Sequence, residues 1–143
     1  MRGVILRETG KPVEVTGELS LRRPGPGEVR VRLRAAGVCH SDLSMCEGRL
    51  PARLPLVPGH EGAGEVVELG PGVSGPPVGT HVILSWIPPC GSCALCLGGQ
   101  PNLCVSVPPP PSTVTFEGEP AHAGLGVGCF CGGDRVDARA ARP

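Results

Sequence analysis

The sequence predicts an all-β fold, a barrel or sandwich built from many short strands. Glycine (23 residues) and proline (18 residues) are spread along the 143-residue chain, which is typical of strands joined by tight turns. Segments of alternating apolar and polar residues lie between these turns, and the length suits one domain. Aromatic residues are scarce, with one Trp, two Phe and no Tyr, so we expect a core of Val, Leu, Ile and Ala.

The clearest predicted strand covers residues 29–35, directly after a Pro-Gly-Pro-Gly turn at 24–27. Apolar residues and arginines alternate strictly along it, as expected for a strand with one buried face. The arginines are expected on the solvated face. The apolar residues on the predicted buried face are Val29, Val31, Leu33 and Ala35.

Two further strands are predicted at 65–69 and 81–86, with turn residues between them. Before residue 105, helical character is limited to a short turn at 41–46. The proline run at 108–111 is interpreted as a stiff connector. Near the end, a helix could begin at 137–141, whereas the two glycines and two opposite charges of 131–135 make a poor strand.

Charge and aromatic content argue against nucleic acid as a partner. Thirteen Lys and Arg side chains balance thirteen Asp and Glu, and few aromatics could stack on bases. No segment reaches the roughly 18 apolar residues of a membrane helix, and the first apolar run is too short for a secretory signal. We therefore expect a cytoplasmic protein without membrane partners, whose eight cysteines bind metal or stay free thiols.

Four of the cysteines form a metal-binding pattern within residues 88–106. Their spacing is C-x2-C-x2-C-x7-C, in which the short steps let a loop curl around an ion and the longer step returns the fourth sulfur. Four thiolates around a tetrahedral ion leave no open position, so the pattern predicts a structural zinc site. Its expected ligands are Cys90, Cys93, Cys96 and Cys104.

An iron–sulfur cluster is the main alternative for these cysteines. Its bacterial form shares the C-x2-C-x2-C start but needs a cysteine where Gln100 precedes Pro101. Haem attachment would require a histidine where Leu97 follows Cys96. Disulfides between residues three apart would be strained. Visible absorption of the purified protein would distinguish a cluster from zinc.

Two upstream segments carry further zinc-ligand types at the ends of predicted strands. Cys39 lies in Gly-Val-Cys-His-Ser-Asp (37–42), and His60 lies in Gly-His-Glu-Gly-Ala-Gly (59–64). Each has a carboxylate close by that could orient a ligand. A cysteine or histidine alone is more often a packed residue than a ligand. Their occurrence together with the four-cysteine pattern gives them more weight.

With these motifs the chain resembles the zinc-dependent medium-chain alcohol dehydrogenases. The pattern G-H-E-x-x-G-x5-G-x2-V at 59–73 is similar to that family's zinc signature, and the other two motifs match in order and spacing. The resemblance implies a mainly β, GroES-like barrel for residues 1–128, with a structural zinc lobe at 88–106. A divergent or truncated segment would follow at 129–143.

The resemblance also implies roles for residues of the two upstream motifs. Cys39 and His60 would bind a catalytic zinc, with Glu61 beneath the metal as an occasional or outer ligand. Ser41 would take the alcohol proton into a relay, and Asp42 would hold His60.

The implied activity is oxidation of alcohols, or reduction of aldehydes, by hydride transfer with NAD. An open zinc position would polarise the substrate oxygen, and the Ser41 hydroxyl can both donate and accept. His40 would contact the pyrophosphate of the cofactor. The particular alcohol, the choice between NAD and NADP, and a homo- or hetero-oligomeric state stay open.

Parts of the family pattern have no counterpart in this chain. The family's third catalytic zinc ligand, a cysteine, would follow residue 143, and Cys129 and Cys131 come too early to align with it. The nucleotide-binding α/β domain is absent, and the G-x-G-x-x-G string at 70–75 is interpreted as a turn because no helix can start after it. Ser44 stands where several members place a relay histidine.

We therefore expect a fragment of such an enzyme, with zinc bound firmly in the lobe and weakly, if at all, at Cys39 and His60. The isolated chain should show no turnover. The alternative is a non-catalytic zinc-binding module that partners a full-length homologue, which co-purification with a complete dehydrogenase would favour.

Overall fold

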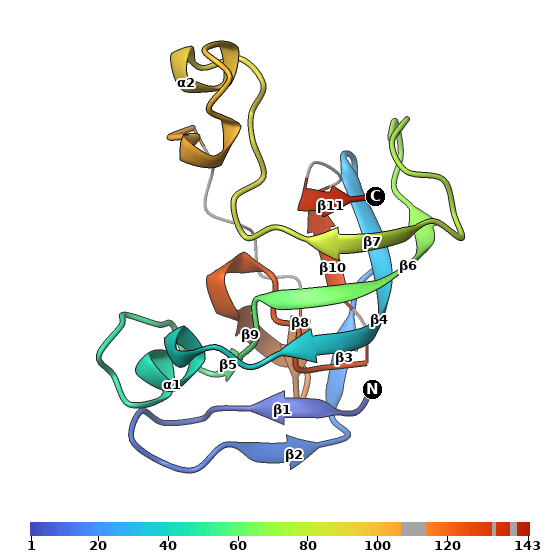
Figure 1. Cartoon of the computed structure of the whole chain (residues 1–143). Helices are drawn as coiled ribbons and strands as arrows, with labels where there is room; N and C mark the ends of the chain where they lie inside the picture. The colour runs from blue at the N-terminus through green and yellow to red at the C-terminus, as the bar shows by residue number, and fades with distance from the viewer. Residues whose placement is uncertain (107–113, 133, 138–139) are drawn as a thin grey trace.

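The mainly β prediction is confirmed by the fold. The computed structural model describes residues 1–106, 114–132 and 140–143, and also 134–137 by their backbone. The described strands form sheets of five, four and two strands, and two short α-helices lie outside them (Figure 1). The predicted proline connector at 108–111 lies outside the described residues.

The five-stranded sheet holds the larger core. Its strand order is β10 (Asp134–Asp137), β4 (Glu28–Gly37), β6 (Glu61–Leu69), β7 (His81–Leu84) and β11 (Ala141–Arg142), all antiparallel. Aliphatic side chains from the three central strands are almost fully buried, which removes their apolar surface from water. They are Val29, Val31, Val66, Val82 and Leu84.

The smaller sheets enclose a second core. The four-stranded sheet has the order β3 (Leu19–Leu21), β8 (Val114–Phe116), β9 (Glu119–Ala123) and β5 (Leu56–Val57). A hairpin of β1 (Gly3–Ile5) and β2 (Glu14–Thr16) lies against it through a bridge between Leu6 and Leu56. The buried residues of this core are Ile5, Leu19, Val57, Val114, Phe116 and Ala121.

Strand β4 follows the predicted alternation for only part of its length. Val29 and Val31 are fully buried and Leu33 is half-buried, but Ala35 is exposed, so its predicted place on the buried face is wrong. The cause is a bulge, because Leu33 pairs with Gly64 and Ala35 with Ala63, which leaves Arg34 as an extra residue. An extra residue exchanges the two faces of a strand beyond it.

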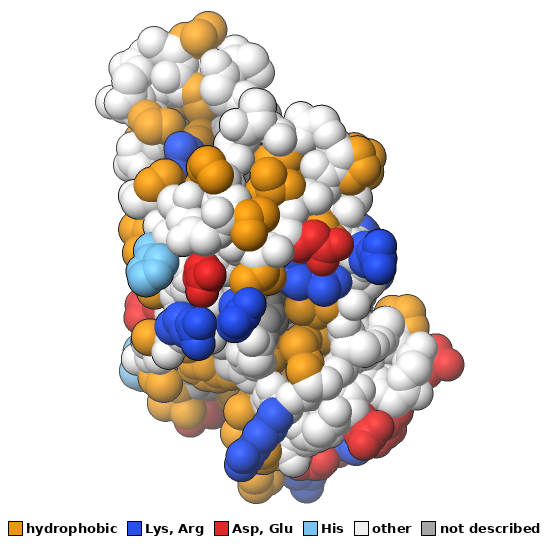
Figure 2. Space-filling model, turned by 90° about the vertical axis from the view of Figure 1, so that its right-hand side faces the viewer, with side chains coloured by type: hydrophobic (Ala, Val, Ile, Leu, Met, Phe, Trp, Pro, Cys, Tyr) orange, Lys and Arg blue, Asp and Glu red, His pale blue; other side chains and the backbone are white. Residues whose placement is uncertain are grey.

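The arginines of β4 lie on the outer face, as predicted. Arg30 pairs with Glu68 at 3.1 Å, and Arg34 with Glu65 at 3.3 Å, both across to β6. Basic and acidic side chains are interspersed over the body of the molecule (Figure 2), and exposed pairs of this kind contribute little to stability.

The last segment differs from its prediction. Asp134 and Arg135, expected in a poor strand, belong to β10 and pair with Val31 and Arg30. Of the segment 137–141, where a helix could begin, residue 137 ends β10 and residue 141 begins β11, and residues 138–139 lie outside the described residues. Hydrogen bonding to the edges of the five-stranded sheet outweighs weak local propensity here.

Two helical segments connect to the sheets. Helix α1 (His40–Cys46) follows β4 directly and confirms the predicted helical turn. Helix α2 (Ala94–Leu97) and a 3-10 turn at Pro101–Leu103 belong to a lobe that stands apart from the sheets, beyond β7 (Figure 1). Among the described residues, no helix is long and apolar enough to cross a membrane.

Candidate metal centres

The lobe brings its four cysteines together as predicted. Ligand atoms of Cys90, Cys93, Cys96 and Cys104 all lie within 4.8 Å of one another. The sulfurs of Cys90 and Cys96 are 3.9 Å apart, and those of Cys93 and Cys104 are 4.0 Å apart. These distances exclude disulfides, and all four are free thiols. The cluster can hold a metal ion.

Backbone amides stabilise negative charge on Cys90. The N–H groups of Ser92 and Cys93 donate to its sulfur at 3.4 and 3.3 Å, and the Ser92 hydroxyl lies 3.6 Å away. These donors lower the pKa of Cys90 to about 5, and the Ser92 amide makes the largest contribution. Residues 82–116 carry no charged side chain, so the lobe depends on backbone dipoles and on a bound cation to hold thiolates.

A second group forms where α1, β4 and β6 meet. Ligand atoms of Cys39, His60 and Glu61 lie within 4.8 Å of one another. Cys39 immediately precedes α1, His60 immediately precedes β6, and Glu61 is the first residue of β6. Asp42 and Gly59 are 17 positions apart in the sequence, and the backbone amide of Gly59 reaches the Asp42 carboxylate. Gly59 has a φ of +92°, a conformation that favours glycine.

Asp42 joins the two halves of this group. The residue is 3% exposed, and its Oδ2 accepts the N–H of Cys39 at 3.0 Å. Its Oδ1 accepts the N–H of Gly59 at 3.0 Å and lies 3.1 Å from Nδ1 of His60. Because a carboxylate only accepts, this contact places the His60 proton on Nδ1 and leaves the lone pair on Nε2.

The remaining predicted residues of this region lie on the first two turns of α1. The Ser41 hydroxyl is 3.7 Å from the sulfur of Cys39 and half-buried. His40 is exposed, and its Nδ1 lies 3.3 Å from the hydroxyl of Ser44, one helical turn away. The sequence analysis missed this His40–Ser44 contact, although their spacing of four residues on a helix could have predicted it.

The other three cysteines belong to neither group. Cys46 lies at the end of α1, where burial raises the pKa of its thiol. Cys129 is buried against Gly62, and the Cys131 thiol lies 3.2 Å from the carbonyl of Gly128. Cys129 belongs to the core of the five-stranded sheet, Cys131 packs against the second core, and Cys46 packs against the cluster of Leu6, Met45 and Leu56.

Comparison with known proteins identifies the family. Residues 25–141 match the model of the alcohol dehydrogenase GroES-like domain. The chain belongs to this family. It is 47% identical over 103 residues to the NDMA-dependent alcohol dehydrogenase of Amycolatopsis methanolica, which covers 72% of this chain and 28% of that protein.

Further relatives agree with this assignment. The S-(hydroxymethyl)glutathione dehydrogenase of Paracoccus denitrificans is 47% identical over 107 residues, covering 74% of this chain and 28% of that protein. The crystal structure of an alcohol dehydrogenase zinc-binding domain protein from Burkholderia ambifaria superposes with a TM-score of 0.87 at 31% identity, covering 98% of this chain and 40% of that one. The chain thus spans between a quarter and two fifths of these relatives.

In this GroES-like domain the G-x-G-x-x-G string is structural, as predicted. Residues 70–75 lie in the turn between β6 and β7, and no helix follows them before β7 begins. Gly70 donates its N–H to the backbone carbonyl of Glu28 at 2.8 Å, and a side chain at position 70 would overlap the carbonyl of Gly25. Close backbone approach explains this glycine without a phosphate.

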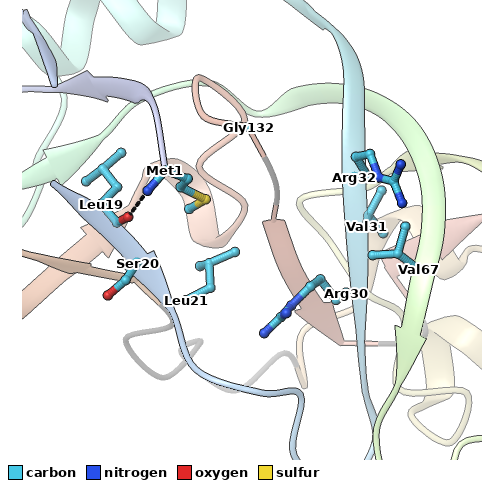
Figure 3. Close-up of a pocket in the computed structure, with 9 residues that line it drawn as sticks. All are labelled: Met1, Leu19, Ser20, Leu21, Arg30, Val31, Arg32, Val67 and Gly132. Carbon is cyan, nitrogen blue, oxygen red and sulfur yellow. Dashed lines mark hydrogen bonds between the residues drawn. The ribbon is translucent and has the colours of Figure 1, made fainter. Parts of the chain in front are cut away.

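The GroES-like domain also has a cleft of about 370 Å³ between β3 and β4 (Figure 3). The terminal ammonium of Met1 donates to the carbonyl of Leu19 on one side, and Arg30 and Arg32 lie on the other. None of the predicted site residues is among the described residues that line it. The metal-ligand groups are therefore separate from this cleft.

Proposed function

We propose that this chain forms the zinc-binding, alcohol-binding part of an NAD-dependent alcohol dehydrogenase. The observation that carries the proposal is the buried Asp42, which holds the Cys39 amide and the His60 ring at once. If Asp42 and His60 formed only a structural ion pair, the Cys39 sulfur and the Glu61 carboxylate would not need to lie beside the His60 ring. That donor set is typical of a zinc site.

The lobe fits a structural zinc ion. Four sulfurs placed tetrahedrally at the usual Zn–S distance of about 2.3 Å lie about 3.8 Å from one another. The two sulfur–sulfur distances of 3.9 and 4.0 Å support one ion of this size. With four protein ligands the ion would have no free position, so we assign the lobe a structural role.

The donors at Cys39, His60 and Glu61 fit a catalytic zinc. They supply sulfur, imidazole nitrogen and carboxylate oxygen, and Asp42 fixes the His60 tautomer with Nε2 available as the ligand. When bound in an open site, zinc polarises an alcohol or carbonyl oxygen and lowers the pKa of the alcohol. Cys39 and His60 would be the direct ligands from this chain and Glu61 an occasional or outer one, so room remains for the substrate oxygen.

Residues of α1 would handle the proton and the cofactor. The Ser41 hydroxyl lies beside the Cys39 sulfur, so it can accept the proton of a bound alcohol and pass it on. His40 is exposed at the start of α1, where it can reach an anionic cofactor group. When bound, NAD would supply the hydride-accepting chemistry, and the part of this chain would be to align it through His40.

The relatives support the substrate class. Two of them are named as alcohol and S-(hydroxymethyl)glutathione dehydrogenases, whose names specify hydroxyl-bearing substrates. We infer that the protein to which this chain contributes acts on small alcohols or aldehydes.

A cobalt experiment tests the open site. The lobe is first loaded with one equivalent of Zn²⁺, and Co²⁺ is added as a spectroscopic reporter of the second site. Ethanol should change the visible absorption of the Co²⁺-loaded chain, because the ethanol oxygen would bind at the open position of the site. Ethanol should not change the absorption of the Cys39→Ala variant. An identical ethanol effect in both proteins, or none in either, would contradict the proposal.

A further inference from the structure

Gly37 and Glu61 face each other at the junction of β4 and β6. They are paired in register at the end of the two strands that lies beside the Cys39, His60 and Glu61 group. The Glu61 side chain lies over the bare Cα of Gly37. A Cβ added to Gly37 would overlap Oε2 of Glu61 and would lie 3.2 Å from its Cβ.

The backbone does not require glycine at position 37. Its φ is outside the left-handed range, in contrast to Gly59 with φ +92°. The preceding residues of the strand, Ala35 and Ala36, carry a Cβ and pair with β6 in the same ladder. Space for the carboxylate, rather than a special backbone conformation, therefore accounts for the glycine.

We propose that Gly37 is a positioning residue for the second metal site, because its missing side chain leaves the space that holds the Glu61 carboxylate beside Cys39 and His60. The inference rests on the proposed metal site. The atom that a methyl group would displace is the far end of an exposed, flexible side chain. Gly37→Ala should therefore turn the carboxylate away while β4 stays paired.

A double-mutant cycle tests this role through metal affinity. Co²⁺ is titrated into chains whose lobe already holds Zn²⁺, for wild type, Gly37→Ala, Glu61→Gln and the double variant. Each single change should weaken Co²⁺ binding about tenfold, the usual loss when a group that supports a metal ligand set is removed. The double variant should bind no more weakly than Glu61→Gln, because the carboxylate is already gone.

Three outcomes would overturn the positioning role of Gly37. Equal Co²⁺ affinity in wild type and Gly37→Ala would do so while leaving the metal site itself intact. The role would also be overturned if Gly37→Ala weakened Co²⁺ binding as much in the Glu61→Gln variant as it does in the wild-type chain. If the wild-type chain bound no second Co²⁺, both the metal site and the role of Gly37 would be overturned.

Matched variants control for folding. Gly75→Ala is the control, since a Cβ there has no atom within 4 Å and its backbone is unstrained, and it should leave Co²⁺ affinity unchanged. If Gly37→Ala does not fold, Gly37→Ala combined with Glu61→Ala should restore folding, because the clash is with the Glu61 side chain. Failure of that pair to fold would contradict the proposal.

Discussion

At the scale of single residues, Asp42 connects more of the candidate site than any metal-ligand residue does. Its two oxygens receive hydrogen bonds from Cys39, Gly59 and His60, which come from two segments of the chain. The sequence indicated the Asp42–His60 contact only through a family resemblance. It could not predict the Gly59 bond, because that bond depends on a left-handed turn that brings the backbone back to α1.

Loss of Asp42 should destabilise the fold. Asp42→Ala leaves two buried donors, of Gly59 and His60, and the half-buried Cys39 amide without their acceptor, which we expect to cost about 2–4 kcal/mol. Urea unfolding of the zinc-loaded chain measures the effect. Glu8→Ala, which removes an exposed carboxylate, serves as the control and should stay within about 0.5 kcal/mol of wild type. Equal stability of the two variants would contradict the bridging role of Asp42.

The lobe should release zinc at higher pH when Cys90 loses a donor. Protons compete with zinc for thiolates, so affinity falls as pH decreases. The donors around Cys90 lower its pKa to about 5, so protons displace zinc from this sulfur only at a more acidic pH. Ser92→Ala removes the hydroxyl donor at 3.6 Å and should move the zinc-release midpoint up by about half a pH unit.

A zinc-indicator dye follows this release during acid titration. Ser106→Ala, an exposed serine outside the cysteine group, is the matched control and should leave the midpoint unchanged. A midpoint for Ser92→Ala that coincides with that of the control would show that the hydroxyl does not support the Cys90 thiolate.

At the scale of elements, strands with strong alternation were predictable and their irregularities were not. The pattern of residues 29–35 predicts β4, but the bulge at Arg34 depends on how β6 pairs with it, and this exposes Ala35. Strands of two or three residues, such as β5 and β8, are too short to produce a periodic signal. Strand β10 arises from pairing with β4 rather than from its own residues.

The lobe should depend on its metal while the sheets do not. Helix α2 and the 3-10 turn bury no residue, so the lobe has no apolar core of its own, in contrast to the two sheets. Removing metal with a chelator should abolish hydrogen-exchange protection of the Leu97 and Gly98 amides and leave the β4 and β6 amides protected. Retained protection in the metal-free lobe would contradict this dependence.

At the scale of the whole molecule, the two metal-ligand groups have different surroundings. One lies in the projecting lobe with four cysteines, and the other lies at the junction of α1 with the five-stranded sheet (Figure 1). Local spacing was enough to predict the first group, because its ligands span 15 residues. The second required the fold, since strand pairing brings residue 37 to residue 61 and sets Cys39 beside His60.

Zinc content tests the central claim most directly. If the chain holds a structural site and a separate catalytic one, wild type purified with excess Zn²⁺ should contain about two ions per chain. Cys39→Ala should contain about one, retained by the lobe. Metal analysis after equilibrium dialysis against a fixed concentration of free Zn²⁺, which retains a weakly bound ion, gives both numbers. One ion per chain in both proteins would show that Cys39, His60 and Glu61 do not form a metal site.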